Sequence, residues 1–197
     1  MEFEEIYAEF LPKIRRYLAR LLGEQEAEDT AQEVFAKVSR GLDSFKGQSK
    51  LSTWVYRIAT NTAIDKLRSS AHTQPFGQTS LEDNTGVANN PPTIPQADTL
   101  TDQKVIRKEM SECVRDYVDR LPPDYQTVLV LSELEEFKNR EIADILQITL
   151  ENVKVRLHRA RARLKQELDD GCDFYRNAEG TLACDRKPIL IEPNKPE

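Results

Sequence analysis

Residues 139–168 read NREIADILQITLENVKVRLHRARARLKQEL and predict two helices joined by a very short turn at residues 147–149. Apolar residues of the second helix are spaced four, three, four and four positions apart, at Val153, Leu157, Ala160, Leu164 and Leu168. This spacing places them on one side of the helix, because an α-helix has about 3.6 residues per turn. The first helix is shorter and turns Ile142, Ala143, Ile145 and Leu146 inward. Together they predict a helix-turn-helix.

Basic residues cover most of the remaining surface of the second helix. Glu151 is the single acid between residues 149 and 165, against Lys154, Arg156, Arg159, Arg161, Arg163 and Lys165. A charge run of this kind is most often a solvated helix face. The short helix before it and the near absence of acids favour DNA binding, with the second helix in the major groove.

In that geometry, residues near the helix start and one turn further on reach base edges, and the others lie nearer to phosphates. The residues expected at base edges are Lys154, Val155, His158 and Arg159. Those expected nearer to the phosphates are Arg156, Arg161 and Arg163. Thr149 is the expected N-cap of this helix, since its hydroxyl can accept an unpaired amide of the first turn.

The composition limits the class of protein. The chain has 197 residues and a formal net charge of −6, and its 39% hydrophobic residues can support one domain or two small ones. Few glycines and many good helix formers predict an all-α fold. The acidic N-terminus is unlike a signal peptide and no stretch is long enough for membrane insertion, so we expect a cytoplasmic protein. Two isolated histidines give little support to an enzyme, and no catalytic residue, metal site or cofactor is expected.

The chain divides into four segments. Helical periodicity covers residues 1–70 and returns over residues 105–170, which predicts two small helical domains. Residues 71–104 are rich in proline and acidic residues and predict a flexible acidic linker. Residues 171–197 form a cysteine-containing tail outside the helical pattern.

The helix expected at residues 52–68, STWVYRIATNTAIDKLR, has an unusual polar face. A surface helix ordinarily carries glutamate and lysine there. This one instead offers Tyr56, Arg57, Thr60, Asn61, Lys66 and Arg68.

Several segments occur in an order typical of one family. They are AEDTAQEVFAKV at 27–38, FKGQSKLSTWVYRIATNTAIDKLR at 45–68, LPPDYQTVLVLSELEEFKNREIADIL at 121–146 and VKVRLHRARARL at 153–164. The sequence resembles bacterial RNA polymerase sigma factors of the extracytoplasmic-function (ECF, group 4) subfamily. In that family the first segment binds polymerase, and the second opens and reads the −10 promoter element. The last two segments read the −35 element.

The resemblance implies a sigma factor that directs promoter-specific transcription initiation without a catalytic site of its own. Its implied partners are core RNA polymerase and promoter DNA, and an anti-sigma protein is a further partner that the resemblance allows. The residues implied in polymerase binding are Asp29, Gln32, Glu33 and Phe35. Those implied at the unpaired −10 strand are Ser49, Lys50, Ser52, Thr53, Tyr56, Arg57 and Asn61. Such residues suit single-strand capture, which needs hydroxyl and amide groups for bases and cations for phosphates.

Alternatives stay open at some positions. Asp29 and Glu33 also suit a solvated face, Phe35 suits a core, and Trp54 lies on an apolar stripe, which favours core packing over base stacking. Gln147 departs from the family because glycine is usual in its turn. Val155 stands where the family commonly has a small hydroxyl residue.

The tail offers two interpretations. Residues 173–176 and 181–184 can form a hairpin that brings Cys172 and Cys184 together, with a redox-switched disulfide or a metal site including Asp173 and Asp185 as consequences. The other interpretation is a disordered or merely packed tail. Cys113 is expected in a core. A DNA-binding regulator that never contacts polymerase remains the competing function.

Overall fold

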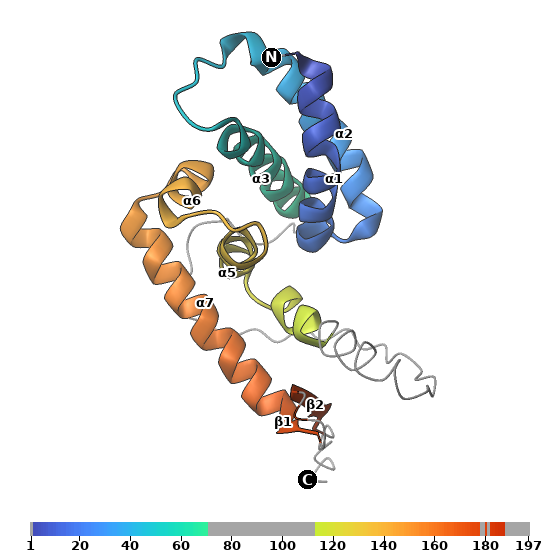
Figure 1. The fold of residues 1–197 in the computed structure, drawn as a ribbon, viewed down its shortest axis with the longest axis vertical. Helices are drawn as coiled ribbons and strands as arrows, with labels where there is room; N and C mark the ends of the chain where they lie inside the picture. Colours follow the sequence, from blue (N-terminus) through green and yellow to red (C-terminus); the bar gives the residue numbers. More distant parts are fainter. Residues whose placement is uncertain (1, 71–112, 178–179, 181, 188–197) are drawn as a thin grey trace, which may run out of the picture. The chain divides into compact units, whose positions relative to one another are not determined.

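The computed structural model describes residues 2–70, 113–177, 180 and 182–187. Figure 1 shows helices and one short hairpin in this part of the chain, which confirms the expected all-α fold apart from the two strands. The expected linker, residues 71–104, lies outside the described residues. None of the described helices has the length and apolar character needed to cross a membrane.

The described residues belong to two compact units. The first unit contains residues 2–70 and 121–161, and the second contains residues 113–120 and those from 162 onward. The four segment boundaries expected from composition stay a prediction.

Three helices form the N-terminal part of the first unit: α1 (Phe3–Leu22), α2 (Glu24–Gly41) and α3 (Leu51–Ser70). The three pack against one another, with α1 alongside α2 (Figure 1). Each contributes fully buried aliphatic side chains, such as Ile14, Val34 and Val55. Burial of one such side chain contributes about 1.5–3 kcal/mol, so this core holds α3 in a fixed orientation.

The second part of the first unit begins after Pro122. It comprises α5 (Pro123–Leu129), a π-helical turn (Val130–Leu134), α6 (Asn139–Leu146) and the first half of α7 (Leu150–Gly171). Proline is favourable at the first position of α5, because its missing N–H would have no partner there. Of the expected inward residues of α6, Ile142 and Ile145 are fully buried, whereas Ala143 and Leu146 are half-buried.

The turn between α6 and α7 confirms the helix-turn-helix. Gln147 ends α6 in the left-handed conformation, with φ 54° and ψ 42°, and its N–H donates to the carbonyl of Ala143. Thr149 is the N-cap of α7, as expected, since its hydroxyl accepts the N–H of Asn152 at 3.2 Å. A residue with a side chain therefore occupies the backbone conformation that favours glycine.

The second unit has a small core of its own. Residues 113–119 are helical, and Cys113 and Tyr117 from this segment are buried together with Cys172. Leu164 and Leu168 of α7 pack against them. Cys113 is thus in a core, as expected.

The tail forms the hairpin that the sequence suggested. β1 (Cys172–Arg176) and β2 (Leu182–Arg186) pair in antiparallel fashion. A Cβ atom at Gly171, between α7 and β1, would lie 2.0 Å from the hydroxyl oxygen of Tyr117. Glycine at this position therefore allows Tyr117 to lie against the end of α7.

Candidate nucleic-acid interface

Four neighbouring side chains of α7 form an exposed surface, which we call the recognition face: Lys154, Val155, His158 and Arg159. They share one side of the helix, because positions i, i+1, i+4 and i+5 lie close together. Val155 keeps 45% of its surface exposed. The other side of α7 is anchored by Val153, Leu157 and Ala160, which are buried. The residues expected at base edges are therefore presented together.

Arg156 points away from this face. Its guanidinium lies 3.1 Å from a carboxylate oxygen of Asp124, and the two side chains keep only 23% and 9% of their surface exposed. Asp124 belongs to the first turn of α5, so the pair links α5 to α7. The sequence placed Arg156 nearer to phosphates, whereas the structure pairs it internally.

The other basic residues expected near phosphates form exposed ion pairs. Arg161 donates two hydrogen bonds to one oxygen of Glu133, at 3.2 and 2.6 Å. Arg163 donates to Glu167 at 2.9 Å. The hydrogen bond from Arg161 lowers the pKa of Glu133. Exposed pairs of this kind contribute about 0–1 kcal/mol, so an incoming phosphate can replace the carboxylate at little cost.

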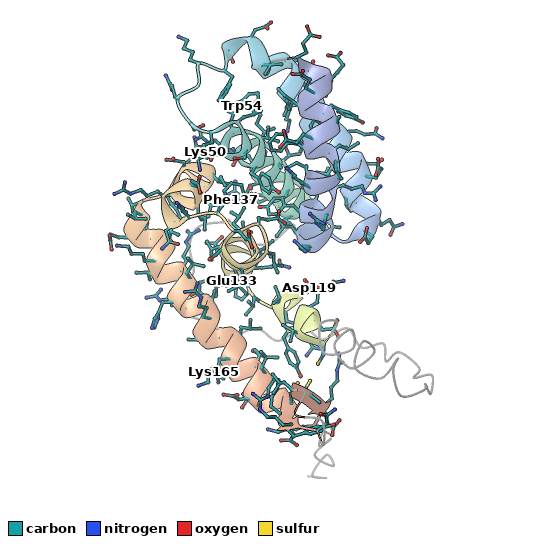
Figure 2. All side chains as sticks on the ribbon, in the orientation of Figure 1. Lys50, Trp54, Asp119, Glu133, Phe137 and Lys165 are labelled. Atoms are coloured by element: carbon teal, nitrogen blue, oxygen red, sulfur yellow. The ribbon has the colours of Figure 1, made fainter. Side chains whose placement is uncertain are left out.

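The residues implied at the −10 strand differ in exposure. Lys50 and Asn61 are exposed, Ser49, Ser52 and Arg57 are half-buried, and Thr53 and Tyr56 are buried. Trp54 is half-buried, with its ring centroid 5.0 Å from that of Phe45, in line with a packing role. Figure 2 labels Lys50 and Trp54 at the start of α3. The exposed groups therefore lie just before α3, at Lys50, and near its middle, at Asn61.

Tyr56 contacts the segment between the π-helical turn and α6. Its hydroxyl donates to a carboxylate oxygen of Glu135 at 2.6 Å. Its ring lies 4.7 Å from that of Phe137, measured between centroids, and Figure 2 labels Phe137 beside α3. Burial, followed by the hydrogen bond to Glu135, raises the pKa of Tyr56. Only 3% of Tyr56 is exposed, so it is covered in this structure.

Residues 135–141, which include this segment and the first turn of α6, also pair with two basic residues of the first unit. Glu135 accepts from Arg20 of α1 at 2.7 Å. Glu141, in the first turn of α6, lies 2.7 Å from the amine of Lys50. That hydrogen bond, with one from the backbone N–H of Lys138, lowers the pKa of Glu141. Residues 135–141 thus cover part of the α3 surface with acidic groups.

Thr60 belongs to the interior. Its hydroxyl donates to the carbonyl of Tyr56 at 2.7 Å and accepts the hydroxyl of Tyr17 at 2.8 Å. Thr60 is fully buried. The unusual polar face of α3 is therefore partly an internal hydrogen-bond network that joins α3 to α1.

Arg57 has an unsatisfied donor. Within the described part of the chain, its buried Nε atom has no hydrogen-bond acceptor. Leaving a buried donor unpaired costs about 1–3 kcal/mol, and more for a charged group. An anionic ligand at this guanidinium would remove that cost.

On α2, the residues implied in polymerase binding separate into two groups. Asp29, Gln32 and Glu33 are exposed on one side of the helix. Glu33 lies 2.8 Å from the amine of Lys37, and this hydrogen bond lowers the pKa of Glu33. Phe35 is only 2% exposed, and its ring centroid lies 4.9 Å from that of Tyr7. Phe35 is thus a core residue in this structure.

The sequence did not predict the residues that pair with Arg156, Tyr56 and Lys50. Asp124, Glu135, Phe137 and Glu141 gave no signal of their own in the sequence. Glu135 and Tyr56 are 79 residues apart, so no local pattern connects them. The one available clue is chemical, because a half-buried basic or phenolic group needs a partner.

These features define a class: a helical protein with a helix-turn-helix, a basic recognition face and a second polar helix surface. Comparison with known families agrees. The family Sigma-70 region 2 matches residues 6–73, and Sigma-70, region 4 matches residues 111–164.

Individual relatives extend over most of the chain. The ECF RNA polymerase sigma factor SigW of Bacillus subtilis is 34% identical over 169 residues, which cover 85% of this chain and 89% of SigW. The ECF RNA polymerase sigma-E factor of Haemophilus influenzae is 30% identical over 168 residues, covering 84% and 87%. The solved sigma factor RpoE of Bartonella quintana, in complex with the anti-sigma factor NepR, has a similar fold. Its TM-score is 0.60 at 22% identity, over 85% of this chain and 96% of that one.

The chain belongs to the ECF family of RNA polymerase sigma factors. As an initiation subunit it binds core RNA polymerase and promoter DNA and directs promoter-specific transcription initiation.

Proposed function

We propose that the recognition face of α7 reads the duplex −35 element while the N-terminal part of α3 holds the unpaired −10 strand. The observation that carries this proposal is the exposure of Lys154, Val155, His158 and Arg159 together on a helix whose opposite side is fixed in a core. Lysine, histidine and arginine supply donors for base edges, and the apolar Val155 suits a thymine methyl group.

Arg161 and Arg163 contact phosphates on either side of the recognition face. Their present partners, the exposed Glu133 and the half-buried Glu167, are exchanged for phosphate oxygens. Arg156 has a different role: it positions α7 through Asp124. The affinity of the face for duplex DNA should fall steeply with salt, because each phosphate contact releases counterions.

On α3, Lys50, Ser52, Arg57 and Asn61 hold the −10 strand. A phosphate contact by Arg57 requires its half-buried side chain to turn outward, which would also relieve the unpaired, buried Nε atom. Lys50 exchanges Glu141 for DNA, which is inexpensive because 71% of the lysine side chain is exposed. Tyr56 reaches the strand only after Glu135 and Phe137 separate from α3.

The exposed side of α2, with Asp29, Gln32 and Glu33, binds core polymerase, and Phe35 supports it from the core. The protein has no catalytic site of its own and acts in the cytoplasm, where transcription takes place. An anti-sigma protein is a further proposed partner. It is supported by a fold shared with RpoE, which was solved with the anti-sigma factor NepR.

The experiment is transcription in vitro with purified core polymerase and a library of promoter fragments. We expect new start sites only when this protein is added, and a lower yield of transcripts from them with Arg159→Ala. The competing regulator would bind duplex sites alone and yield no new start sites, and that result would overturn the proposal.

A further inference from the structure

Three cysteine thiols meet in the second unit. The sulfur atoms of Cys113, Cys172 and Cys184 all lie within 4.8 Å of one another. Those of Cys113 and Cys172 are 3.8 Å apart, although 59 residues separate them in the sequence. Two of the three residues are buried and Cys184 is half-buried, so the cluster is open toward one side.

The register of the hairpin determines which side chains join this cluster. Cys172 pairs with Arg186, and Phe174 pairs with Cys184. Since alternate residues of a strand share a face, Cys172 and Cys184 lie diagonally on the same face of the hairpin.

The carboxylates that the sequence suggested as ligands lie elsewhere. Asp173 and Asp185 pair with each other and therefore lie on the opposite face of the hairpin. The side chain of Asp173 is 71% exposed, and its carboxylate lies 3.6 Å from Lys187. The hairpin therefore does not bring Asp173 and Asp185 to the two cysteines, whereas the fold brings Cys113 to them.

We propose that Cys113, Cys172 and Cys184 form a binding site for a soft, thiophilic metal ion such as Zn²⁺. Thiolates are the ligands that such ions prefer. Two thiolates on zinc, with bonds of about 2.3 Å at a tetrahedral angle, lie about 3.8 Å apart. That is the distance between the sulfur atoms of Cys113 and Cys172.

A disulfide would need a different arrangement of the sulfur atoms from the one observed. Its sulfur atoms are about 2.05 Å apart, so Cys113 and Cys172 would have to approach by almost 2 Å. The diagonal position of Cys172 and Cys184 on the hairpin keeps their Cβ atoms further apart than directly paired residues. A single metal ion satisfies all three thiols, whereas one disulfide leaves the third thiol unpaired.

Burial raises the pKa of Cys172 and that of Cys184, the latter to about 11, so a bound ion would have to displace the thiol protons, and two neighbouring groups can assist. The hydroxyl of Tyr117 lies 3.6 Å from the sulfur of Cys172 and can donate to a thiolate there. Arg186, which is ion-paired with Asp116, also interacts with Cys113 and brings a positive charge beside the cluster. Three elements meet at this site: the helical residues 113–119 and the two strands. A bound ion would therefore stabilise the second unit.

The first test uses the unmodified full chain, reduced and freed of metal. Added Cd²⁺ should produce a thiolate-to-metal charge-transfer band that saturates at one ion per chain. Zn²⁺ should compete for the site and Mg²⁺ should not. Saturation with Zn²⁺ should protect all three thiols against Ellman's reagent. Thiols that react at the same rate with and without Zn²⁺ would overturn the proposal.

The second test identifies the ligands. Cys113→Ser, Cys172→Ser and Cys184→Ser should each lower the affinity for Cd²⁺ by at least about tenfold. Asp173→Asn and Asp185→Asn are matched controls on the other face and should leave the affinity unchanged. An unchanged affinity for Cd²⁺ in Cys113→Ser would contradict the proposed site. So would a reduced protein that binds no metal ion and only forms a disulfide when it is oxidised. If a variant fails to fold, protection of the thiols by Zn²⁺ in the unmodified chain still tests whether the site binds metal.

Discussion

At the scale of single residues, Asp124 and Arg156 form a mostly buried ion pair that joins α5 to α7. Loss of the arginine would leave the carboxylate of Asp124 buried without a partner. Because an uncompensated buried charge is costly, we predict that Arg156→Ala lowers the free energy of unfolding by roughly 2–3 kcal/mol. This is below the cost for a fully buried pair, since 23% of the Arg156 side chain is exposed. Urea denaturation measures the change.

Arg159→Ala is the matched control, three residues further along the same helix. Arg159 is exposed, so its removal should change stability by less than about 0.5 kcal/mol. The affinity of the polymerase holoenzyme for a duplex fragment that contains the −35 element should fall instead. Equal destabilisation by the two changes would contradict the separate roles of Arg156 and Arg159.

Gln147 carries a side chain in a left-handed conformation, with φ 54°. Glycine adopts this conformation without a steric penalty, so Gln147→Gly should raise the free energy of unfolding by up to about 1 kcal/mol. Asp144→Gly, three residues earlier and also exposed, should lower it by about 1 kcal/mol, because glycine is unfavourable inside a helix. The two thermal unfolding curves should shift in opposite directions; a shift of both to lower temperature would argue against strain at Gln147.

At the scale of elements, residues 135–141 cover part of α3. Phe137 packs on Tyr56, and Glu135 accepts its hydroxyl. We predict that Phe137→Ala uncovers this surface and raises the affinity for a single-stranded −10 oligonucleotide several-fold, because less free energy is needed to separate the segment from α3. Fluorescence anisotropy of a labelled oligonucleotide measures the affinity.

Leu134→Ala is the control for that experiment, because Leu134 is 51% exposed and lies just before the same segment. It should leave the affinity unchanged. An unchanged or weaker affinity in Phe137→Ala, in a protein that still melts cooperatively, would show that residues 135–141 do not limit access to α3.

Glu141 gives the contact between α3 and α6 a pH dependence. The hydrogen bond from Lys50 lowers its pKa in the folded protein. A lowered folded-state pKa stabilises the fold at pH values above the ordinary carboxyl pKa, and this contribution disappears as pH falls through the folded value. We therefore predict that Glu141→Gln reduces stability near neutral pH and makes the acid side of the stability profile less steep. Parallel profiles for the two proteins, measured by thermal melting, would contradict this.

The sequence predicted those features that local patterns determine. Helical periodicity predicted the helices, and the spacing of Val153, Leu157 and Ala160 predicted the buried side of α7. The turn residues of the tail indicated the hairpin as one of two interpretations. Burial of Tyr56 was not predictable, because its partner Glu135 is 79 residues away. The same holds for the cysteine cluster, in which Cys113 and Cys172 are 59 residues apart. Contacts of this range depend on the packing of several elements at once.

At the scale of the whole molecule, an acidic protein carries a concentrated set of basic groups on one helix. The net charge is −6, yet the recognition face of α7 is basic. Glutamates form ion pairs with basic residues that are proposed to contact DNA, as in Arg161–Glu133 and Lys50–Glu141. Free protein should therefore bind DNA weakly, and the polymerase should supply the rest of the binding free energy.

We propose that two helix surfaces divide promoter recognition, with α3 on the unpaired strand and α7 on the duplex. Site-specific crosslinking in the open promoter complex tests it most directly, with a photoreactive residue at exposed Asn61, at exposed Arg159 or, as a control, at exposed Ala8 of α1. We predict crosslinks from Asn61 to the unpaired −10 strand, from Arg159 to the −35 duplex, and none to DNA from Ala8. Crosslinks from Asn61 to the −35 duplex, or none from Asn61 to the unwound strand, would contradict the account.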